Sequence, residues 1–332
     1  MEGYNIALVG ATGMVGRTFL KVLAERKFPI ANLYAFASER SAGQTVRCGD
    51  REVVVEALDE NSFDRDIDIA LFSAGAGISK KFAPIAKSKG VIVVDNSSAW
   101  RMDKEIPLVV PEVNPDDAFS HDGIIANPNC STIQCMLPLR ALQQRYGLER
   151  VIYNTYQSVS GSGVKGVKDL EEGTTDCYPY PIQNNCLPHI DVFLENGYTK
   201  EEQKMIDETR KILGVEDLPI TATAVRIPVA SAHSVSINVT LKEDFELDEV
   251  KQILSDFPNL ILKDNPEKLE YPMPIDAAGH DEVWVGRIRR DDSFERTLNL
   301  WVVADNIRKG AASNTVQIAE LLITREPLKR DM

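Results

Sequence analysis

The stretch Asn5-Ile-Ala-Leu-Val-Gly-Ala-Thr-Gly-Met-Val-Gly16 indicates how the first part of this chain folds. Its apolar start is typical of a buried strand, and the glycine turn leads into an amphipathic helical segment at residues 17–26. Glycines permit the sharp turn, tight helix packing and close approach of a pyrophosphate to the amides of the helix start. The spacing is GxxGxxG rather than GxGxxG, and such a turn can also be purely structural. Its place between strand and helix favours a nucleotide site.

The pattern around this stretch predicts an α/β first domain. Strand-like runs recur at 33–37, 53–55, 67–72 and 91–94, with a helical pattern at 79–88. Strands that alternate with helices predict a Rossmann-type, doubly wound parallel sheet.

The pattern changes after about residue 150. Longer alternating strands lie at 151–158, 221–228, 234–241, 283–290 and 297–304, and helical patterns at 165–172, 200–213 and 247–255. Alternation predicts an antiparallel sheet with one solvated face, so the second domain is expected to be α+β. The last helix, near 310–324, could pack on either domain by its pattern alone. We expect a nucleotide-binding domain of 1–129 with about 308–332, and a catalytic domain of 130–307.

Composition bounds the functions available to the chain. It has 332 residues, of which 43% are apolar and 26% charged, as in ordinary globular proteins of about two domains. Thirty-seven basic against fifty acidic residues give a net charge of −13, which disfavours nucleic acid and anionic membranes as partners. The chain lacks a long apolar run and a signal-peptide pattern at its start, so we expect a cytoplasmic protein.

The end of the second predicted strand bears on the choice of nucleotide. Enzymes that use NAD usually place an acidic residue there for the ribose hydroxyl. Here Arg40 is flanked by Ser38 and Ser41, which suits a 2′-phosphate and favours NADP. Glu39 leaves use of both nucleotides open, and the segment could also be a solvated loop of mixed charge.

One of five cysteines stands out as a nucleophile. The turn residues Asn127-Pro128-Asn129 come directly before an apolar run of helical length, so Cys130 falls at or beside a helix N-cap. There the helix dipole and free amides stabilise a thiolate. Cys135 lies inside the apolar helix, and the others, Cys48, Cys177 and Cys186, lie in loop-like contexts without an activator. An odd number of cysteines without a CxxC pair or a histidine cluster predicts neither a disulfide framework nor a metal site.

A thiolate next to a nicotinamide suggests aldehyde chemistry. Addition to an aldehyde gives a thiohemiacetal, and loss of hydride to the nicotinamide leaves a thioester. A base must take the hydroxyl proton. His233 lies between two predicted strands, seven residues after Arg226, whereas the other three histidines lie in loops or in the irregular segment 174–188 and just after it. On the residues alone, His233 could equally be a structural histidine.

Taken together, these motifs resemble those of the aspartate-semialdehyde dehydrogenase family. The matching segments are 10–16, 97–102 (Ser-Ser-Ala-Trp-Arg-Met), 127–132 (Asn-Pro-Asn-Cys-Ser-Thr), 157–163 (Gln-Ser-Val-Ser-Gly-Ser-Gly) and 226–234, in order along nearly the whole chain. The resemblance implies the reversible reaction of L-aspartate 4-semialdehyde, phosphate and NADP to L-aspartyl-4-phosphate and NADPH. That step belongs to lysine, threonine, methionine and diaminopimelate biosynthesis. The resemblance also implies a homodimer formed through the second domain.

The resemblance assigns roles to particular residues. It implies Cys130 as nucleophile, His233 as general acid and base, and Gln157 as the residue that orients the substrate. The implied substrate contacts are Arg226 for the α-carboxylate, Arg101 for phosphate, Glu201 for the ammonium group, Lys204 as an aid to phosphate binding, and Asn129. The implied cofactor contacts are Gly10, Thr12, Gly13, Met14, Val15, Ser38, Arg40, Ser41, Ser160, Gly161, Asn314 and Gln317. On the residues alone, Glu201 and Lys204 look like an exposed helical pair worth a few tenths of a kcal/mol.

The sequence leaves two rival functions open. N-acetyl-γ-glutamyl-phosphate reductase has the same architecture and thioester mechanism, but its acetylated substrate would leave Glu201 without an ammonium partner. Its cysteine motif also typically reads Gly-Cys-Tyr, where this chain has Asn129-Cys130-Ser131. The other rival is a non-catalytic NADP-binding relative, which should lack the thiol, the base or the substrate arginine.

Overall fold

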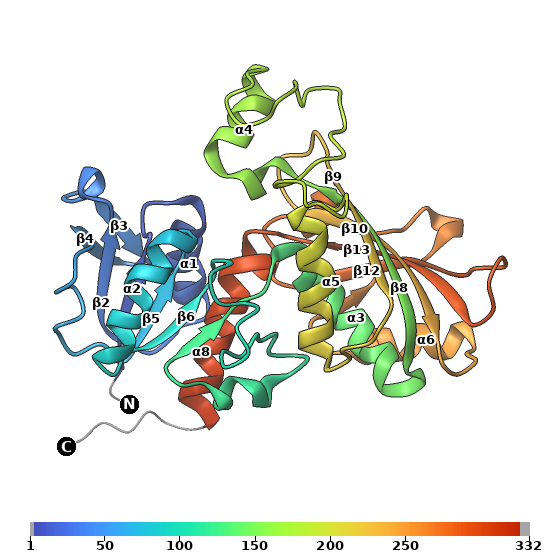
Figure 1. Ribbon diagram of the computed structural model, residues 1–332, viewed down its shortest axis with the longest axis horizontal. Helices are drawn as coiled ribbons and strands as arrows, with labels where there is room; N and C mark the ends of the chain where they lie inside the picture. The colour runs from blue at the N-terminus through green and yellow to red at the C-terminus, as the bar shows by residue number, and fades with distance from the viewer. Residues whose placement is uncertain (1–2, 326–332) are drawn as a thin grey trace. The chain divides into compact units, whose positions relative to one another are not determined.

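The computed structural model describes residues 3–325 (Figure 1). Within these residues the chain forms two compact units. The first consists of the chain up to Pro128 together with the segment from Ala311 onward, and the second is Asn129–Gly310. Each helix of the described residues is too short or too polar to serve as a membrane span.

The first unit is built on a seven-stranded sheet in the order β3-β4-β2-β1-β5-β6-β7. The strands are β1 (Tyr4–Val9), β2 (Ile30–Ala37), β3 (Thr45–Cys48), β4 (Arg51–Ala57), β5 (Ile69–Phe72), β6 (Ile92–Asp95) and β7 (Ile124–Ala126). Neighbours are parallel except at the β3–β4 hairpin. The predicted Rossmann-type sheet is confirmed, whereas β7 and the antiparallel hairpin at one edge were not predicted.

Alternation along β1 explains why helices cover both faces of this sheet. Ile6 and Leu8 belong to the apolar cluster that contains residues of α1 (Met14–Glu25) and α8 (Ser313–Arg325). Ala7 belongs to a second cluster, which contains residues of α2 (Ala76–Ser88). Since successive side chains of a strand point to opposite faces, β1 contributes residues to both clusters. The last helix, α8, therefore packs in the first unit; short turns of helix, η1 (Glu39–Ser41) and η2 (Pro115–Ser120), complete it.

The second unit is built on a six-stranded sheet in the order β11-β12-β13-β10-β8-β9. Its strands are β8 (Leu148–Gln157), β9 (Ile220–Arg226), β10 (His233–Leu241), β11 (Leu260–Leu262), β12 (Val283–Arg290) and β13 (Thr297–Ala304). The four central strands pair antiparallel as predicted. Both edge strands run parallel to their neighbours. The predicted antiparallel arrangement is therefore wrong for β9, and β11 was not predicted. A parallel pair needs a long crossover, and the segment that carries α4 (Gly163–Glu172) and α5 (Lys200–Leu213) supplies it between β8 and β9.

Helix α3 (Cys130–Tyr146) packs against both the sheet and other helices of the second unit. It contacts β8, β10, β12 and β13 as well as helices α5 and α6 (Leu247–Asp256), which is why all residues from 131 to 139 are buried. The helices of this unit are α3 (Cys130–Tyr146), α4 (Gly163–Glu172), α5 (Lys200–Leu213), α6 (Leu247–Asp256) and α7 (Pro274–Ala277), with shorter turns η3 (Val159–Ser162) and η4 (Pro266–Lys268). A π-helical turn, η5 (Arg308–Ala312), leads out of the unit. Figure 1 shows α3 and α5 side by side against the sheet.

Candidate active site

Cys130 is the first residue of α3, and Asn129 is its N-cap. The side-chain Oδ1 of Asn129 accepts hydrogen bonds from the amides of Ser131 at 2.9 Å and Thr132 at 3.3 Å. The sequence prediction that free amides stabilise a thiolate is therefore wrong for these two, because the cap already uses them. The helix dipole remains to favour an anion at Cys130, whose side chain is partly exposed.

The remaining cysteines lack the same setting. Cys135 is fully buried, which raises the pKa of its thiol well above the usual range. Cys48 is not in a loop, as its sequence context suggested, but ends β3 in the core, and burial raises its pKa despite the charge of Arg51. Cys177 and Cys186 are exposed and lie outside any helix or strand. Cys130 is thus the one thiol at a helix start among the described residues.

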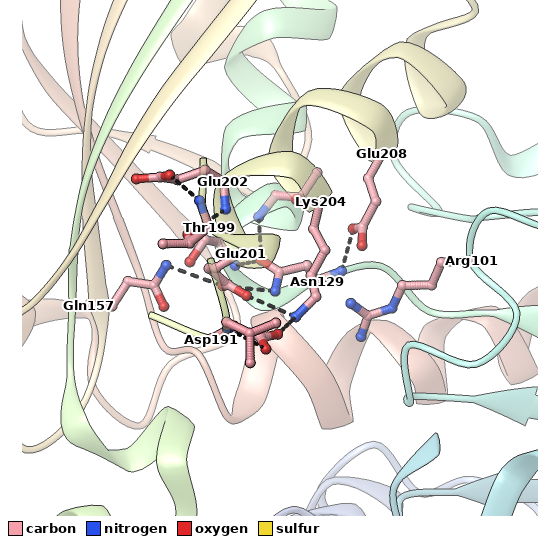
Figure 2. A network of polar contacts seen from close by, with 12 residues as sticks. Arg101, Asn129, Gln157, Asp191, Thr199, Glu201, Glu202, Lys204 and Glu208 are labelled. Atoms are coloured by element: carbon pink, nitrogen blue, oxygen red, sulfur yellow. Dashed lines mark hydrogen bonds and ion pairs between the residues drawn. The ribbon is translucent and has the colours of Figure 1, made fainter. Parts of the chain in front are cut away.

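A buried carboxylate, Glu201, joins three of the candidate site residues (Figure 2). Its Oε1 accepts hydrogen bonds from Asn129 Nδ2 at 2.9 Å and from Gln157 Nε2 at 3.2 Å. Its Oε2 accepts one from Lys204 Nζ at 3.1 Å. Burial alone would raise the pKa of Glu201, but the charge of Lys204 and these hydrogen bonds outweigh it and lower the pKa. The alternative of an exposed helical pair is therefore wrong, and Glu201 is a fixed negative charge.

The same helix end carries further polar groups. Thr199 and Glu202 form a capping box that starts α5, which holds Glu201 in the first turn. Lys204 also donates to Asp191 Oδ2 at 2.7 Å, so that its charge is shared by two carboxylates. Burial lowers the pKa of Lys204, but Glu201 and Asp191 raise it overall. Sequence reasoning missed Asp191, and it missed Glu208, whose Oε2 accepts from the amide of Asn129 at 2.6 Å.

Arg226 and His233 lie together in the second unit. Arg226 ends β9, where its register partner is Gln157, and its Nη1 donates to the carbonyl oxygen of Ser158 at 2.7 Å. Its buried Nε has no hydrogen-bond partner within residues 3–325. A Cβ placed on Gly161 would lie 3.2 Å from Arg226 Nη1 and 3.3 Å from His233 Nε2. The lack of a side chain at residue 161 thus leaves space beside both nitrogens.

His233 is the first residue of β10 and is fully buried. Burial, and then the positive charge of Arg226, lower the pKa of its imidazole well below the usual value. The ring is therefore neutral at pH 7, as a base must be. Gln134 of α3 donates from Nε2 to the carbonyl oxygens of His233 at 3.3 Å and Val302 at 3.2 Å, which fixes the helix that starts at Cys130 to the strand that starts at His233.

The glycine turn of the first unit fits a dinucleotide. A Cβ on Gly10 would lie 2.4 Å from the carbonyl oxygen of Ser73, and one on Gly16 would lie 2.1 Å from that of Gly10. Gly13 is the N-cap of α1, so no cap side chain occupies the amides of Met14 and Val15. A pocket of about 410 Å³ opens over this turn and is lined by Gly10, Thr12, Gly13, Ala37 and Ser38 among others.

The other residues of the candidate nucleotide site differ in their setting. Ser38 and Arg40 are exposed, and the hydroxyl of Thr12 donates to Ser41 Oγ at 3.4 Å. Asn314 is buried and donates to Asn127 Oδ1 at 2.7 Å and to the carbonyl oxygen of Val109 at 3.0 Å. This gives Asn314 a structural role within the first unit.

Four more residues were predicted to contact cofactor or phosphate. Two of them hydrogen-bond to other protein groups, and two lie in the second unit. Gln317 donates to Glu112 Oε1 at 3.1 Å. Arg101 donates from Nε to the carbonyl oxygen of Asn127 at 2.9 Å and from Nη2 to that of Asn96 at 3.1 Å. Ser160 and Gly161 belong to the second unit, where Gly161 adjoins the Arg226 and His233 nitrogens.

The first unit has a glycine turn suited to a nucleotide on a doubly wound sheet. The second unit, an α+β domain, has a thiol at a helix start and a neutral imidazole. These features define the class of cysteine-dependent dehydrogenases that use a nicotinamide nucleotide. Two family models match the chain: the semialdehyde dehydrogenase NAD binding domain over residues 5–121, and the semialdehyde dehydrogenase dimerisation domain over residues 139–309. The chain belongs to the aspartate-semialdehyde dehydrogenase family.

Individual relatives agree with the family models. The aspartate-semialdehyde dehydrogenase of Aquifex aeolicus is 54% identical, over 97% of this chain and 98% of its own. The crystal structure of the Vibrio cholerae aspartate semialdehyde dehydrogenase II complexed with ASA has a TM-score of 0.94 at 43% identity, over 99% of this chain and 100% of that one. The Candida albicans enzyme with NADP has a TM-score of 0.78 at 25% identity, over 98% and 100%.

Proposed function

We propose that this chain catalyses the reversible, NADP-dependent conversion of L-aspartyl-4-phosphate to L-aspartate 4-semialdehyde and phosphate, a step of lysine, threonine, methionine and diaminopimelate biosynthesis. The observation that carries this proposal is the buried guanidinium of Arg226, whose Nε lacks a partner within residues 3–325 and whose Nη1 borders the same space beside Gly161 as Nε2 of His233. A planar guanidinium is suited to a carboxylate, and here it would hold one beside a neutral base. The relative complexed with ASA supports the same substrate.

The two units take separate tasks in this proposal. The first would bind NADP through the glycine turn, with Ser38, Arg40 and Ser41 toward the 2′-phosphate, and NADP when bound supplies or accepts the hydride at the acyl carbon. The family model and the relative with NADP support this choice of cofactor. The second unit would hold the substrate and form the homodimer, in line with the dimerisation model that matches it.

Cys130 performs the covalent step in the biosynthetic direction. Its thiolate attacks the acyl carbon, phosphate leaves with the electron pair of the broken C–O bond, and a thioester remains on the sulfur. Reduction at that carbon gives a thiohemiacetal, whose oxygen takes a proton from the protonated ring of His233. Collapse returns this proton to His233, returns the thiolate to Cys130 and releases the semialdehyde. In the opposite direction, His233 accepts the hydroxyl proton, which its neutral ring can do at pH 7.

The remaining residues bind and orient the substrate. Glu201, ionised and buried, would attract the substrate ammonium and holds the side chains of Asn129 and Gln157 in place. Arg101 would bind phosphate with the aid of Lys204. Lys204 would do so while it also forms ion pairs with Asp191 and Glu201.

An assay in the oxidative direction tests this proposal. Purified protein is mixed with NADP, phosphate and L-aspartate 4-semialdehyde, and the absorbance of reduced nicotinamide is followed, with N-acetyl-glutamate semialdehyde as the competing aldehyde. We expect turnover with the first aldehyde, dependent on phosphate, and none with Cys130→Ser. Preference for the acetylated aldehyde would replace the proposal by the reductase function. Normal NADP binding without turnover of either would mark a non-catalytic relative.

A further inference from the structure

The segment 173–199, between α4 and α5, packs against the strand that ends in Arg226. The amide of Leu187 donates to the carbonyl oxygen of Arg226 at 2.9 Å, and the amide of Arg226 donates to that of Leu187 at 2.8 Å. Because β9 is an edge strand whose inner neighbour pairs with Arg226 through Gln157, the main chain of Arg226 is held from both sides. A small apolar cluster fixes the same segment, and its buried residues are Val159, Tyr178, Ile182 and Leu187.

Tyr178 is the residue of this cluster that contacts the side chain of Arg226. The Cζ atom of the guanidinium lies 5.8 Å from the centre of the Tyr178 ring, within the range of a cation–π contact. The phenol donates a hydrogen bond to Ser162 Oγ at 3.0 Å. Burial raises the pKa of Tyr178, although that hydrogen bond and the charge of Arg226 lower it in part. The phenol is therefore neutral at pH 7, and Arg226 faces a ring rather than a phenolate.

The position of Tyr178 is fixed by Asp169 of α4, which is fully buried. The carboxylate of Asp169 accepts hydrogen bonds from the amides of Asp176 at 2.8 Å, Cys177 at 2.9 Å and Tyr178 at 3.1 Å. It also accepts one from the hydroxyl of Thr174 at 2.6 Å. These contacts hold the turn at residues 174–178 without using any atom of the arginine. The ring of Tyr178 is thus held in place independently of the guanidinium that it contacts.

The guanidinium of Arg226 is a buried cation, which is costly unless other groups stabilise it. Arg226 is 5% exposed, its Nη1 donates to the carbonyl oxygen of Ser158, and no carboxylate within residues 3–325 forms an ion pair with it. A carboxylate of the protein would stabilise the charge, but it would occupy N–H donors that a substrate carboxylate needs. An aromatic ring attracts a cation through its face and accepts no conventional hydrogen bond. Tyr178 therefore stabilises the charge and leaves donors available for a ligand.

We propose that Tyr178 is a positioning residue, which holds the guanidinium of Arg226 in place for the substrate carboxylate and so increases the affinity for the substrate. The proposal rests on the proposed function, which assigns the carboxylate contact to Arg226. In this role Tyr178 acts through Arg226 and takes no part in the covalent step. Its removal should therefore weaken substrate binding more than it slows the reaction of the bound substrate.

Substitution of the ring is the first test. In Tyr178→Leu we expect the KM for L-aspartate 4-semialdehyde to rise about three- to thirtyfold, the range of a cation–π contact, with kcat and the KM for NADP changed by less than about twofold. Tyr178→Phe keeps the ring and should have a KM near that of wild type. Tyr180→Leu is the matched control, because Tyr180 lies in the same segment and is 66% exposed. A wild-type KM in Tyr178→Leu, or an equal rise in Tyr178→Phe, would overturn the proposal.

Two residues of nearly equal shape provide a test even if Tyr178→Leu fails to fold. Phenylalanine and pentafluorophenylalanine fill almost the same space, but fluorine withdraws electron density from the ring and removes its attraction for a cation. Each is incorporated at position 178 of the full-length protein. We expect the KM for the semialdehyde to be about threefold or more higher with the fluorinated ring, at similar kcat and thermal stability. Equal KM values for the two proteins would overturn the proposal.

Crystal structures without substrate separate this proposal from the proposed function. In wild type and in Tyr178→Phe we expect Arg226 Nη1 to remain within hydrogen-bond distance of the carbonyl oxygen of Ser158. In Tyr178→Leu we expect the guanidinium to leave that position. A guanidinium that stays in place without the ring would overturn the proposal. Displacement in a protein that does not turn over the semialdehyde would instead leave the positioning role intact and reject the proposed function.

Discussion

Gly310 offers a sharp test of how closely the second unit fits around Cys130. A Cβ added at Gly310 would lie 2.8 Å from Cys130 Cβ and 3.2 Å from its Cα. The backbone at Gly310 is not in the left-handed region, so alanine itself is conformationally allowed there. Gly310→Ala therefore acts on Cys130 by contact and not by backbone strain.

The size of the effect follows from the contact distance. Carbon atoms in contact normally lie about 3.5–4.0 Å apart, so the two groups must separate by about 0.7–1.2 Å. A displacement of about 1 Å at reacting atoms can cost about a hundredfold in rate. Overpacking of this kind also costs about 1–3 kcal/mol of stability. We expect kcat of Gly310→Ala to fall by about a hundredfold with little change in the KM for NADP.

The assay combines steady-state kinetics, thermal denaturation and the rate at which iodoacetamide alkylates Cys130, followed by peptide mass spectrometry. Gly77→Ala is the matched control, because Gly77 lies in α2, has no atom within 4 Å of the added Cβ and also lacks a positive φ. This control should retain full activity and gain about 0.5–1 kcal/mol from the better helix former. Wild-type kcat and an unchanged alkylation rate in Gly310→Ala would show that a side chain at residue 310 does not displace Cys130.

Four further predictions concern the candidate site. Cys130→Ser should abolish turnover while a fluorescence titration shows nearly unchanged NADP affinity, because a hydroxyl stays protonated at pH 7; residual turnover above background would contradict this. His233→Ala should lower kcat about 10²- to 10⁴-fold, and a loss under tenfold would indicate another base. Since burial and Arg226 lower the pKa of His233, the wild-type oxidative rate should persist as pH falls and decline only below pH 6.5, the ordinary pKa, which a pH profile in both assay directions measures. Arg40→Ala should reduce the ratio of kcat/KM for NADP to that for NAD, and an unchanged ratio would remove Arg40 from the 2′-phosphate site.

Local sequence patterns predicted much of the fold because apolar residues recur with different periods in strands and in helices. The helix at 200–213 has the predicted bounds, since Thr199 and Glu202 cap it and Gly214 ends it. The helix that starts at Cys130 was also predicted, because the preceding Pro128 and Asn129 mark a turn. The parallel pairing of Gln157 with Arg226 could not be predicted, because it joins residues far apart through α4 and α5.

The polar network of the candidate site could not be predicted from sequence patterns either, because its contacts join residues far apart in the chain. Glu201 looked exposed on its helix, yet Asn129 and Gln157 reach it from segments some 40 to 70 residues away. Ser158 follows Gln157 in a motif that the sequence analysis singled out, but its contact with Asn306 spans 148 residues. Nothing near Asn306 in the sequence marks it, so only the fold reveals that its Oδ1 accepts a hydrogen bond from Ser158.

In the proposed reaction, Cys130 carries the acyl group as a thioester. Full-length protein mixed with L-aspartyl-4-phosphate in the absence of NADPH should accumulate the thioester, which peptide mass spectrometry can locate. We predict an aspartyl adduct on the peptide that contains Cys130 and its loss on addition of NADPH. An adduct on Cys177 or Cys186 instead, or turnover without any adduct at Cys130, would contradict the account.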